Sequence, residues 1–81
     1  MRGTVTLFNS EDGVAAVETE HGEFTVLGIM DDDAVAVGDI ITGDLESLDY
    51  QVMSNETRGI SLSVYVEDTE LPLEEAQQKL Q

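Results

Sequence analysis

The sequence contains no cysteine and no tryptophan, and only three lysine or arginine residues occur among its 81 positions. Without cysteine, neither a disulfide nor a thiolate metal site can support the fold. No apolar segment approaches the roughly 20 residues that a membrane-spanning helix needs. The N-terminal residues also lack the basic stretch and apolar run of a secretory signal, so we expect a soluble, cytoplasmic protein with no membrane association.

Acidic residues are what the chain has in excess. Its 18 Asp and Glu residues outnumber three basic ones, for a formal net charge of -15. Nucleic acid is a polyanion, and binding it normally requires several Lys or Arg side chains to neutralise phosphates. The composition therefore argues against ordinary nucleic-acid binding. Adaptation to a salty cytoplasm is an alternative explanation for the acidity.

Alternation of apolar and polar residues dominates the chain up to about residue 67. Segments typical of strands, separated by polar turns, occur at 4–8, 14–18, 23–29, 40–45 and 60–66. Residues 46–59 fit either an extension of the fourth strand or an additional hairpin. The pattern predicts one all-β domain over residues 1–67, a small five-stranded antiparallel barrel of the OB type, with an SH3-like barrel as the alternative.

The chain changes character after residue 67, where a tail or short helix is predicted over residues 68–81. Asp68 or Thr69 could cap this helix. An apolar stripe at helical spacing is formed by Leu73, Ala76 and Leu80. Two to three turns are marginal without docking. We therefore expect the helix to pack on the barrel or to fray, with a role in dimerisation as an alternative.

A short motif opens the chain: Gly3-x-Val5-x-x-Phe8-Asn9, followed by Gly13. A Val-Gly-Asp turn at 37–39 precedes the fourth strand. Over residues 1–45, and weakly at the last strand, the chain resembles a diverged cold-shock domain, in which Gly-x-Val-Lys-Trp-Phe-Asn precedes Lys-Gly-Phe-Gly-Phe-Ile. The resemblance implies an OB-type barrel. Members of that family bind single strands by stacking bases on aromatic rings over a basic surface.

The resemblance also implies a binding face in which the family's aromatic rings are replaced. Leu7 stands in place of Trp, Asp12 in place of Lys, and Val14 and Ala16 in place of two Phe residues. Phe8 is retained and is expected to face partly inward. The candidate binding residues are Leu7, Phe8, Asp12, Val14, Ala16, Thr25 and Leu27. Loss of about four stacking contacts would remove some 4 kcal/mol of binding free energy.

The small apolar patch that these replacements leave has three interpretations. It could receive side chains of a protein partner. It could instead be covered by the C-terminal helix, or some of its residues could belong to the core. The sequence leaves these alternatives open.

Catalysis finds little support, and we expect no enzyme and no cofactor. His21, the single histidine, lies in a predicted turn without a Ser or Cys nucleophile pattern beside it. A cluster of aspartates could gather around a hard cation such as calcium: Asp31, Asp32, Asp33 and Asp39. Their spacing is not that of a calcium-binding loop, so no metal site is assigned.

Together these features predict a noncatalytic, acidic, cold-shock-like binding module that engages a basic protein partner. Weak single-stranded DNA or RNA binding is one alternative, with Arg2 and Arg58 near one edge and Tyr50 or Tyr65 as a stacking ring. Binding of a hard cation is the other. The identity of the partner and the oligomeric state are left open.

Overall fold

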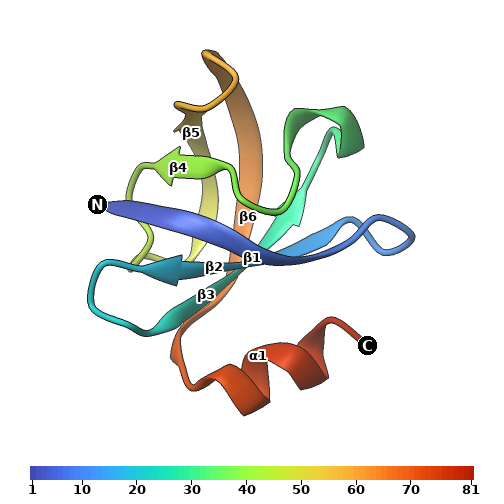
Figure 1. Ribbon diagram of the computed structural model, residues 1–81, viewed down its shortest axis with the longest axis vertical. Helices are drawn as coiled ribbons and strands as arrows, with labels where there is room; N and C mark the ends of the chain where they lie inside the picture. Colours follow the sequence, from blue (N-terminus) through green and yellow to red (C-terminus); the bar gives the residue numbers. More distant parts are fainter.

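A computed structural model describes residues 1–31 and 33–81 in full and, at residue 32, the backbone alone. Its elements, shown in Figure 1, are β1 (Arg2–Asn9), β2 (Val14–Thr19), β3 (Phe24–Ile29), the 3-10 turn η1 (Asp32–Ala34), β4 (Ile40–Thr42), β5 (Asp49–Asn55), β6 (Ile60–Leu71) and α1 (Leu73–Lys79). The strands form a closed antiparallel barrel in the order β1-β2-β3-β6-β5-β4. This confirms the predicted all-β barrel with a short C-terminal helix.

The barrel has six strands, one more than predicted, because the additional hairpin forms. Residues 49–55 are a separate strand, β5, which pairs along its length with β6 and only at its end with β4. Between β4 and β5 the chain leaves the sheet and buries Leu45 completely. The backbone carbonyl of Leu45 accepts a hydrogen bond of 2.7 Å from the Thr25 hydroxyl. The segment that contains Leu45 therefore lies between β4 and β5 along the chain.

The barrel interior is filled by aliphatic side chains from all six strands. Strand alternation turns every second residue inward, so small and branched residues face one another across the barrel. The main cluster consists of Val5, Ala15, Val17, Leu27, Ile29, Ala34, Val35, Ile41, Leu45, Met53, Leu62, Val64 and Val66. The aliphatic face predicted for the last strand is thus the core face from Leu62 onward, whereas Ile60 remains 42% exposed at the end of the barrel.

A β-bulge in β1 sets the direction of its side chains. Val5 pairs with Val17 and Leu7 pairs with Ala16, so Thr6 is an extra residue in the ladder. After the bulge Leu7 points out of the barrel and Phe8 packs against the interior cluster. The expectation that Phe8 faces partly inward is confirmed.

The helix α1 lies outside the barrel, below β1–β3 in the view of Figure 1. It begins after Pro72, so the two residues expected to cap it, Asp68 and Thr69, are still part of β6 and do not cap it. Strand β6 itself continues beyond the predicted boundary at residue 67, as far as Leu71. Glu74 and Glu75 lie in the first turn of α1, where the helix dipole favours negative charge.

Among the described residues, no helix has the length and apolar character required to cross a membrane.

Candidate functional site

The outer face of β1–β3 is where the cold-shock resemblance places its binding residues, and here it is covered by α1. Leu7, Val14 and Ala16 all lie on this face, as the resemblance implies. They belong to a second apolar cluster, outside the barrel, made of Ala16, Phe24, Val26, Ala76, Leu7, Val14, Leu71 and Leu80. Of the three interpretations of this patch, coverage by the C-terminal helix is the one observed for these residues.

Two of the candidate binding residues do not lie on this face. Leu27 is fully buried in the barrel interior, and the side chain of Thr25 is turned inward to Leu45. The β2–β3 register pairs Ala16 with Val26, so Val26 and Phe24 occupy the outer positions instead. Because side chains alternate across a strand, an assignment shifted by one residue reverses every face. The placement of Thr25 and Leu27 on the binding face was therefore wrong.

Asp12 lies in the exposed turn between β1 and β2. Its carboxylate accepts a hydrogen bond of 3.3 Å from the side-chain amide of Asn9. The side-chain oxygen of Asn9 in turn accepts from the backbone N–H groups of Glu11 and Asp12, at 3.1 and 3.3 Å. At the position where the cold-shock resemblance implies a lysine, the carboxylate of Asp12 therefore takes part in the hydrogen bonds of its own turn.

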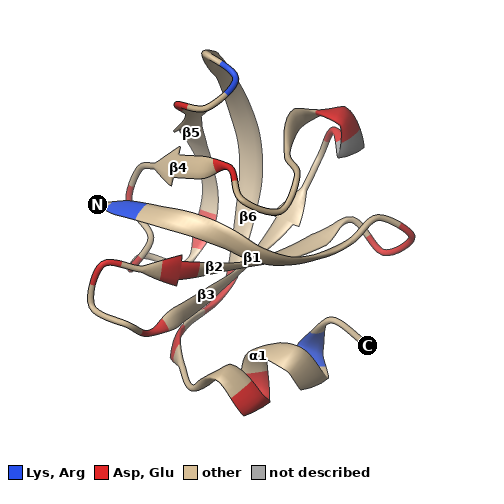
Figure 2. Cartoon of the chain, in the orientation of Figure 1, with Lys and Arg blue, Asp and Glu red and all other residues tan. Residues whose placement is uncertain are grey.

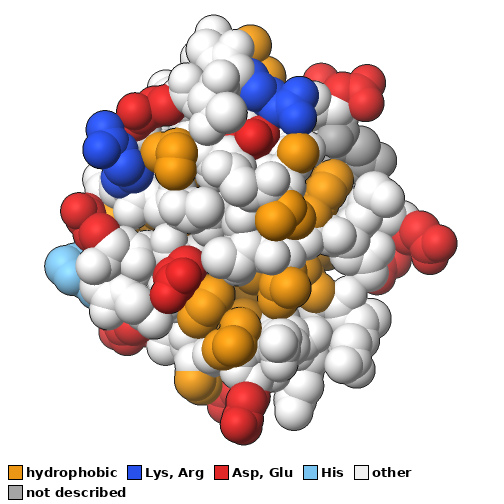
Figure 3. All heavy atoms as spheres, in the orientation of Figure 1, with side chains coloured by type: hydrophobic (Ala, Val, Ile, Leu, Met, Phe, Trp, Pro, Cys, Tyr) orange, Lys and Arg blue, Asp and Glu red, His pale blue; other side chains and the backbone are white. Residues whose placement is uncertain are grey.

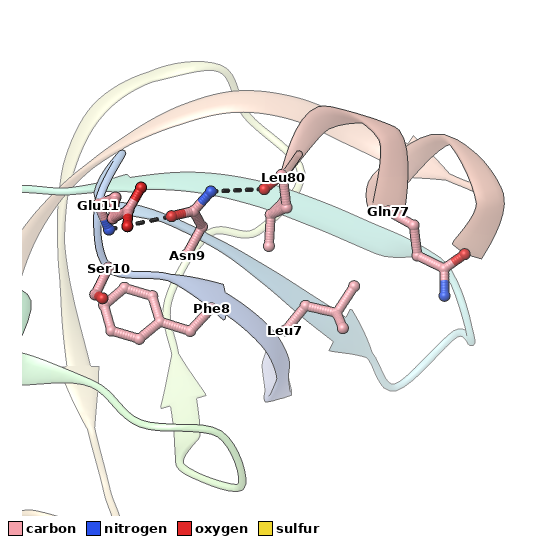
Figure 4. Close-up of a pocket in the computed structure, with 7 residues that line it drawn as sticks. All are labelled: Leu7, Phe8, Asn9, Ser10, Glu11, Gln77 and Leu80. Carbon is pink, nitrogen blue, oxygen red and sulfur yellow. Dashed lines mark hydrogen bonds between the residues drawn. The ribbon is translucent and has the colours of Figure 1, made fainter.

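Two polar contacts hold the C-terminal end of α1. The Lys79 ammonium lies 2.7 Å from the Asp68 carboxylate on β6, which raises the pKa of Lys79 by a hydrogen bond and by charge attraction. The side-chain amide of Asn9 donates a 2.7 Å hydrogen bond to the carbonyl of Leu80 (Figure 4). Ala76, one turn earlier in the helix, is fully buried. The predicted stripe thus docks through Ala76 and Leu80, while Leu73 remains exposed.

A shallow pocket remains at the seam between β1 and α1. It has a volume of about 450 Å³ and is lined by Leu7, Phe8, Asn9, Ser10, Glu11, Gln77 and Leu80. Figure 4 shows residues of β1 and of the following turn on one side and Gln77 and Leu80 of the helix on the other. On this face of the molecule, hydrophobic atoms gather over the seam, and most of the carboxylates lie toward the rim (Figure 3).

Replacing Ala76 by aspartate is expected to detach α1. The helix cannot bury an unpaired carboxylate against Val26 without a cost of several kcal/mol, so undocking is the cheaper response. We expect amide NMR signals of 73–80 to move to random-coil positions, with a loss of about 1–2 kcal/mol in unfolding free energy. The control is Gln78→Asp, which adds the same charge at an exposed position. Unchanged helix signals in Ala76→Asp would show that the contact is not needed for docking.

The three lysine and arginine side chains are all neutralised by ion pairs within the chain. Arg2 lies 3.2 Å from Glu56, Arg58 lies 2.7 Å from Asp39 and Lys79 is paired with Asp68. These cations are far apart on the cartoon of Figure 2, at the N-terminal strand, the β5–β6 turn and the helix. Arg2 and Arg58, considered for nucleic-acid binding at one edge, thus lie apart, and each is engaged in an ion pair.

Asp39 is the centre of a buried polar cluster that holds the loop 31–39 against the β5–β6 turn. Burial acts to raise the pKa of its carboxyl, but hydrogen bonds from Asn55, Arg58 and the Ala36 backbone, together with the charge of Arg58, lower it on balance. The amide of Asn55 also donates to the Ala34 carbonyl at 2.8 Å. This explains the Val-Gly-Asp turn as a structural device.

The aspartates of the 31–39 segment do not form a metal site among the described residues. In residues 1–31 and 33–81, no three acidic or histidine side chains are placed to share an ion. Asp39 is committed to Arg58, and Asp31 accepts a hydrogen bond from the Asp33 backbone N–H. The side chain of Asp32, the remaining member of the proposed cluster, lies outside the described residues. His21 is exposed in the β2–β3 turn.

A second apolar surface lies on the β5–β6 hairpin. It contains the two tyrosines that the sequence offers individually as stacking rings for bases. Tyr50 and Tyr65 are directly opposite each other across the hairpin. Their ring centroids are 4.8 Å apart in an edge-to-face arrangement with an interplanar angle of 65°. The alternation in residues 50–53 and 60–66 indicates two strands, but only the pairing register brings the two rings together.

Comparison with protein-family models, curated proteins and solved structures gave no match, so the cold-shock resemblance rests on the sequence motifs of residues 1–45.

Proposed function

We propose that this protein is a noncatalytic binding module, diverged from a cold-shock-like barrel, whose ligand is a basic protein surface. The observation that carries the proposal is electrostatic. A net charge of -15 remains on a small barrel in which every lysine and arginine is paired internally. Such a field attracts cationic partners and speeds their association. In the cytoplasm, nucleic-acid-binding proteins would supply basic surfaces of this kind.

Two further observations favour a protein ligand over a nucleic acid. On the face equivalent to the family's base-stacking surface, the side chains are aliphatic except for Phe24, which is buried, and α1 occupies the face. The position of the family's lysine is held by Asp12, whose carboxylate faces the Asn9 amide. A single strand approaching this face would meet repulsion and an occupied surface. Residual single-strand binding through the tyrosines of β5–β6 is the competing hypothesis.

A titration with matched probes separates these functions. Short capped peptides that alternate arginine or lysine with glycine are the cationic probes, and oligo-dT and oligo-rU are the nucleic-acid probes. At about 50 mM salt we expect saturable binding of one cationic peptide per barrel, weakening at least about tenfold by about 200 mM salt. A peptide alternating glutamate with glycine is the control and is expected not to bind.

Two results would contradict the proposal. Saturable binding of either oligonucleotide in the same buffer would favour the competing function. Absence of salt-dependent binding by both cationic peptides would remove the electrostatic basis of the proposal, because long-range attraction is strongest at low ionic strength.

A further inference from the structure

The outer face of the β5–β6 hairpin differs from the rest of this acidic molecule. By strand register the face consists of Tyr50, Val52, Ser54, Ser61, Ser63 and Tyr65. None of these side chains is charged, although 18 of the 81 residues are acidic. Tyr50 and Val52 are 71% and 72% exposed. We refer to these six residues as the tyrosine face.

The tyrosine face offers aromatic rings on a rigid support. Tyr50 and Tyr65 extend from β5 and β6, which pair without a break over residues 49–55 and 60–66. Rings held in this way lose little conformational freedom when a ligand binds. Beside them is a shallow depression of about 300 Å³, lined by Tyr50, Gln51, Val52, Ser63 and Val64. An extended segment with one side chain in the depression would lie across both rings.

A carboxylate lies near the base of the Tyr65 side chain. Glu67, two residues after Tyr65, is exposed and is the extra residue of a β-bulge in β6. Its carboxylate lies over Gly28 of β3, where a Cβ would come within 2.8 Å of Glu67 Oε2 and 3.7 Å of Tyr65 Cβ. Gly28 is also the residue paired with Tyr65. A cation placed on the Tyr65 ring would therefore have a counter-charge beside it.

We propose that the tyrosine face binds an arginine-bearing cationic segment of the basic partner, with guanidinium groups stacked on Tyr50 and Tyr65 and paired with Glu67. This inference rests on the proposed function and assigns it a site. Arginine fits better than lysine because its planar guanidinium stacks on aromatic faces. Each cation–π contact at an exposed site contributes about 0.5–1 kcal/mol, equivalent to a two- to fivefold change in affinity.

Charge decides among the possible occupants of this face. A second copy of the chain would bring another net charge of -15 against the first, so self-association through the face is opposed at low salt. A single nucleic-acid strand could stack on the rings, but the lysine and arginine side chains that would neutralise its phosphates are paired elsewhere. A cationic peptide is attracted by the rings, by Glu67 and by the net charge of -15.

The test compares Tyr50→Leu/Tyr65→Leu with Tyr50→Phe/Tyr65→Phe, using the arginine–glycine peptide at about 50 mM salt. Leucine keeps apolar surface but removes the aromatic ring, so we expect about tenfold weaker binding for the leucine variant. Phenylalanine keeps the ring, and we expect affinity within about twofold of the unmodified protein. Leu73→Ala, which trims an exposed apolar side chain on α1, is the control and should not change affinity.

Two readouts locate the peptide. Amide NMR shifts are expected to concentrate at residues 50–52 and 63–67, and the lysine–glycine peptide is expected to bind several-fold more weakly. Glu67→Gln should weaken binding about two- to fivefold, and more than Glu74→Gln, which removes the same charge from the exposed first turn of α1. Spectra of the free variants confirm that each one is folded.

The outcomes separate this inference from the proposed function. Salt-dependent peptide binding that the leucine variant leaves unchanged, or shifts spread over the acidic turns, would overturn the site while leaving the function in place. Failure of the unmodified protein to bind either cationic peptide would overturn both. A dimer that the leucine variant dissociates, or oligo-dT shifts at residues 50–52, would assign the face to a different ligand and also overturn the inference.

Discussion

Replacing Gly3 by alanine is expected to lower the unfolding free energy by about 2–3 kcal/mol and the melting temperature by roughly 10–20 °C. Gly3 pairs with both β2 and β4, so its backbone is held on two sides. A Cβ at this position would overlap the Val17 side chain, lie 2.9 Å from the Glu18 carbonyl oxygen and lie 3.1 Å from Leu45 Cδ1. Thermal unfolding followed by circular dichroism measures the effect.

The matched control for this prediction is Gly22→Ala, in the β2–β3 turn. Gly22 has a φ of +82°, and a Cβ there meets no atom within 4 Å. Gly22→Ala should therefore lower the unfolding free energy only through backbone strain, by about 1 kcal/mol. If Gly3→Ala were no more destabilising than this control, close packing of β1 against β2 would not be what requires glycine in the opening motif.

Removing the Asp39 carboxylate in Asp39→Ala is expected to cost about 3 kcal/mol at neutral pH. One carboxylate oxygen accepts from the Arg58 guanidinium at 2.7 Å, from the Asn55 amide at 2.9 Å and from the Ala36 backbone N–H at 2.9 Å. The substitution leaves the Ala36 N–H without this acceptor. It also removes the hydrogen bonds that join the loop 31–39 to the β5–β6 turn. Chemical denaturation at neutral pH provides the measurement, and a loss below about 1 kcal/mol would contradict the central role given to this carboxylate.

The dependence of this effect on pH follows from the lowered pKa of Asp39 in the folded protein. The carboxylate contributes its full stabilisation above the unfolded-state pKa, near 3.8, and loses it as the pH falls through the lower folded-state pKa. The stability difference between the unmodified protein and Asp39→Asn should therefore be constant at neutral pH and shrink under strong acid. Asp33→Asn, at an exposed position on the same segment, is the control. A stability difference that grew on acidification would contradict a lowered pKa of Asp39 in the folded protein.

Residue patterns predicted much of the barrel because its strands are short and half-buried. Alternation in 60–66 gave the core face of β6, and the Gly3–Phe8 motif placed Leu7 outward and Phe8 inward as observed. The assignment failed on β3, where both faces are buried, one by the barrel and one by α1. With apolar residues at Phe24, Val26 and Leu27, alternation no longer shows which side is the interior.

The candidate surfaces were less predictable than the fold. The sequence shows four aromatic residues but not that Tyr50 and Tyr65 face each other across a hairpin. It shows an apolar stripe after Pro72 but not the face that this stripe covers. Both facts depend on contacts between residues distant in the chain, which single-sequence periodicity does not contain.

The sequence by itself determined the charge of this protein, its all-β character and its low aromatic content, because these follow from composition and from local alternation. Only the tertiary structure decided that α1 covers the altered face, that each basic side chain is paired with an acid, and that an uncharged tyrosine face remains exposed on β5–β6. Those outcomes depend on register and docking, in which a shift of one residue exchanges inside for outside.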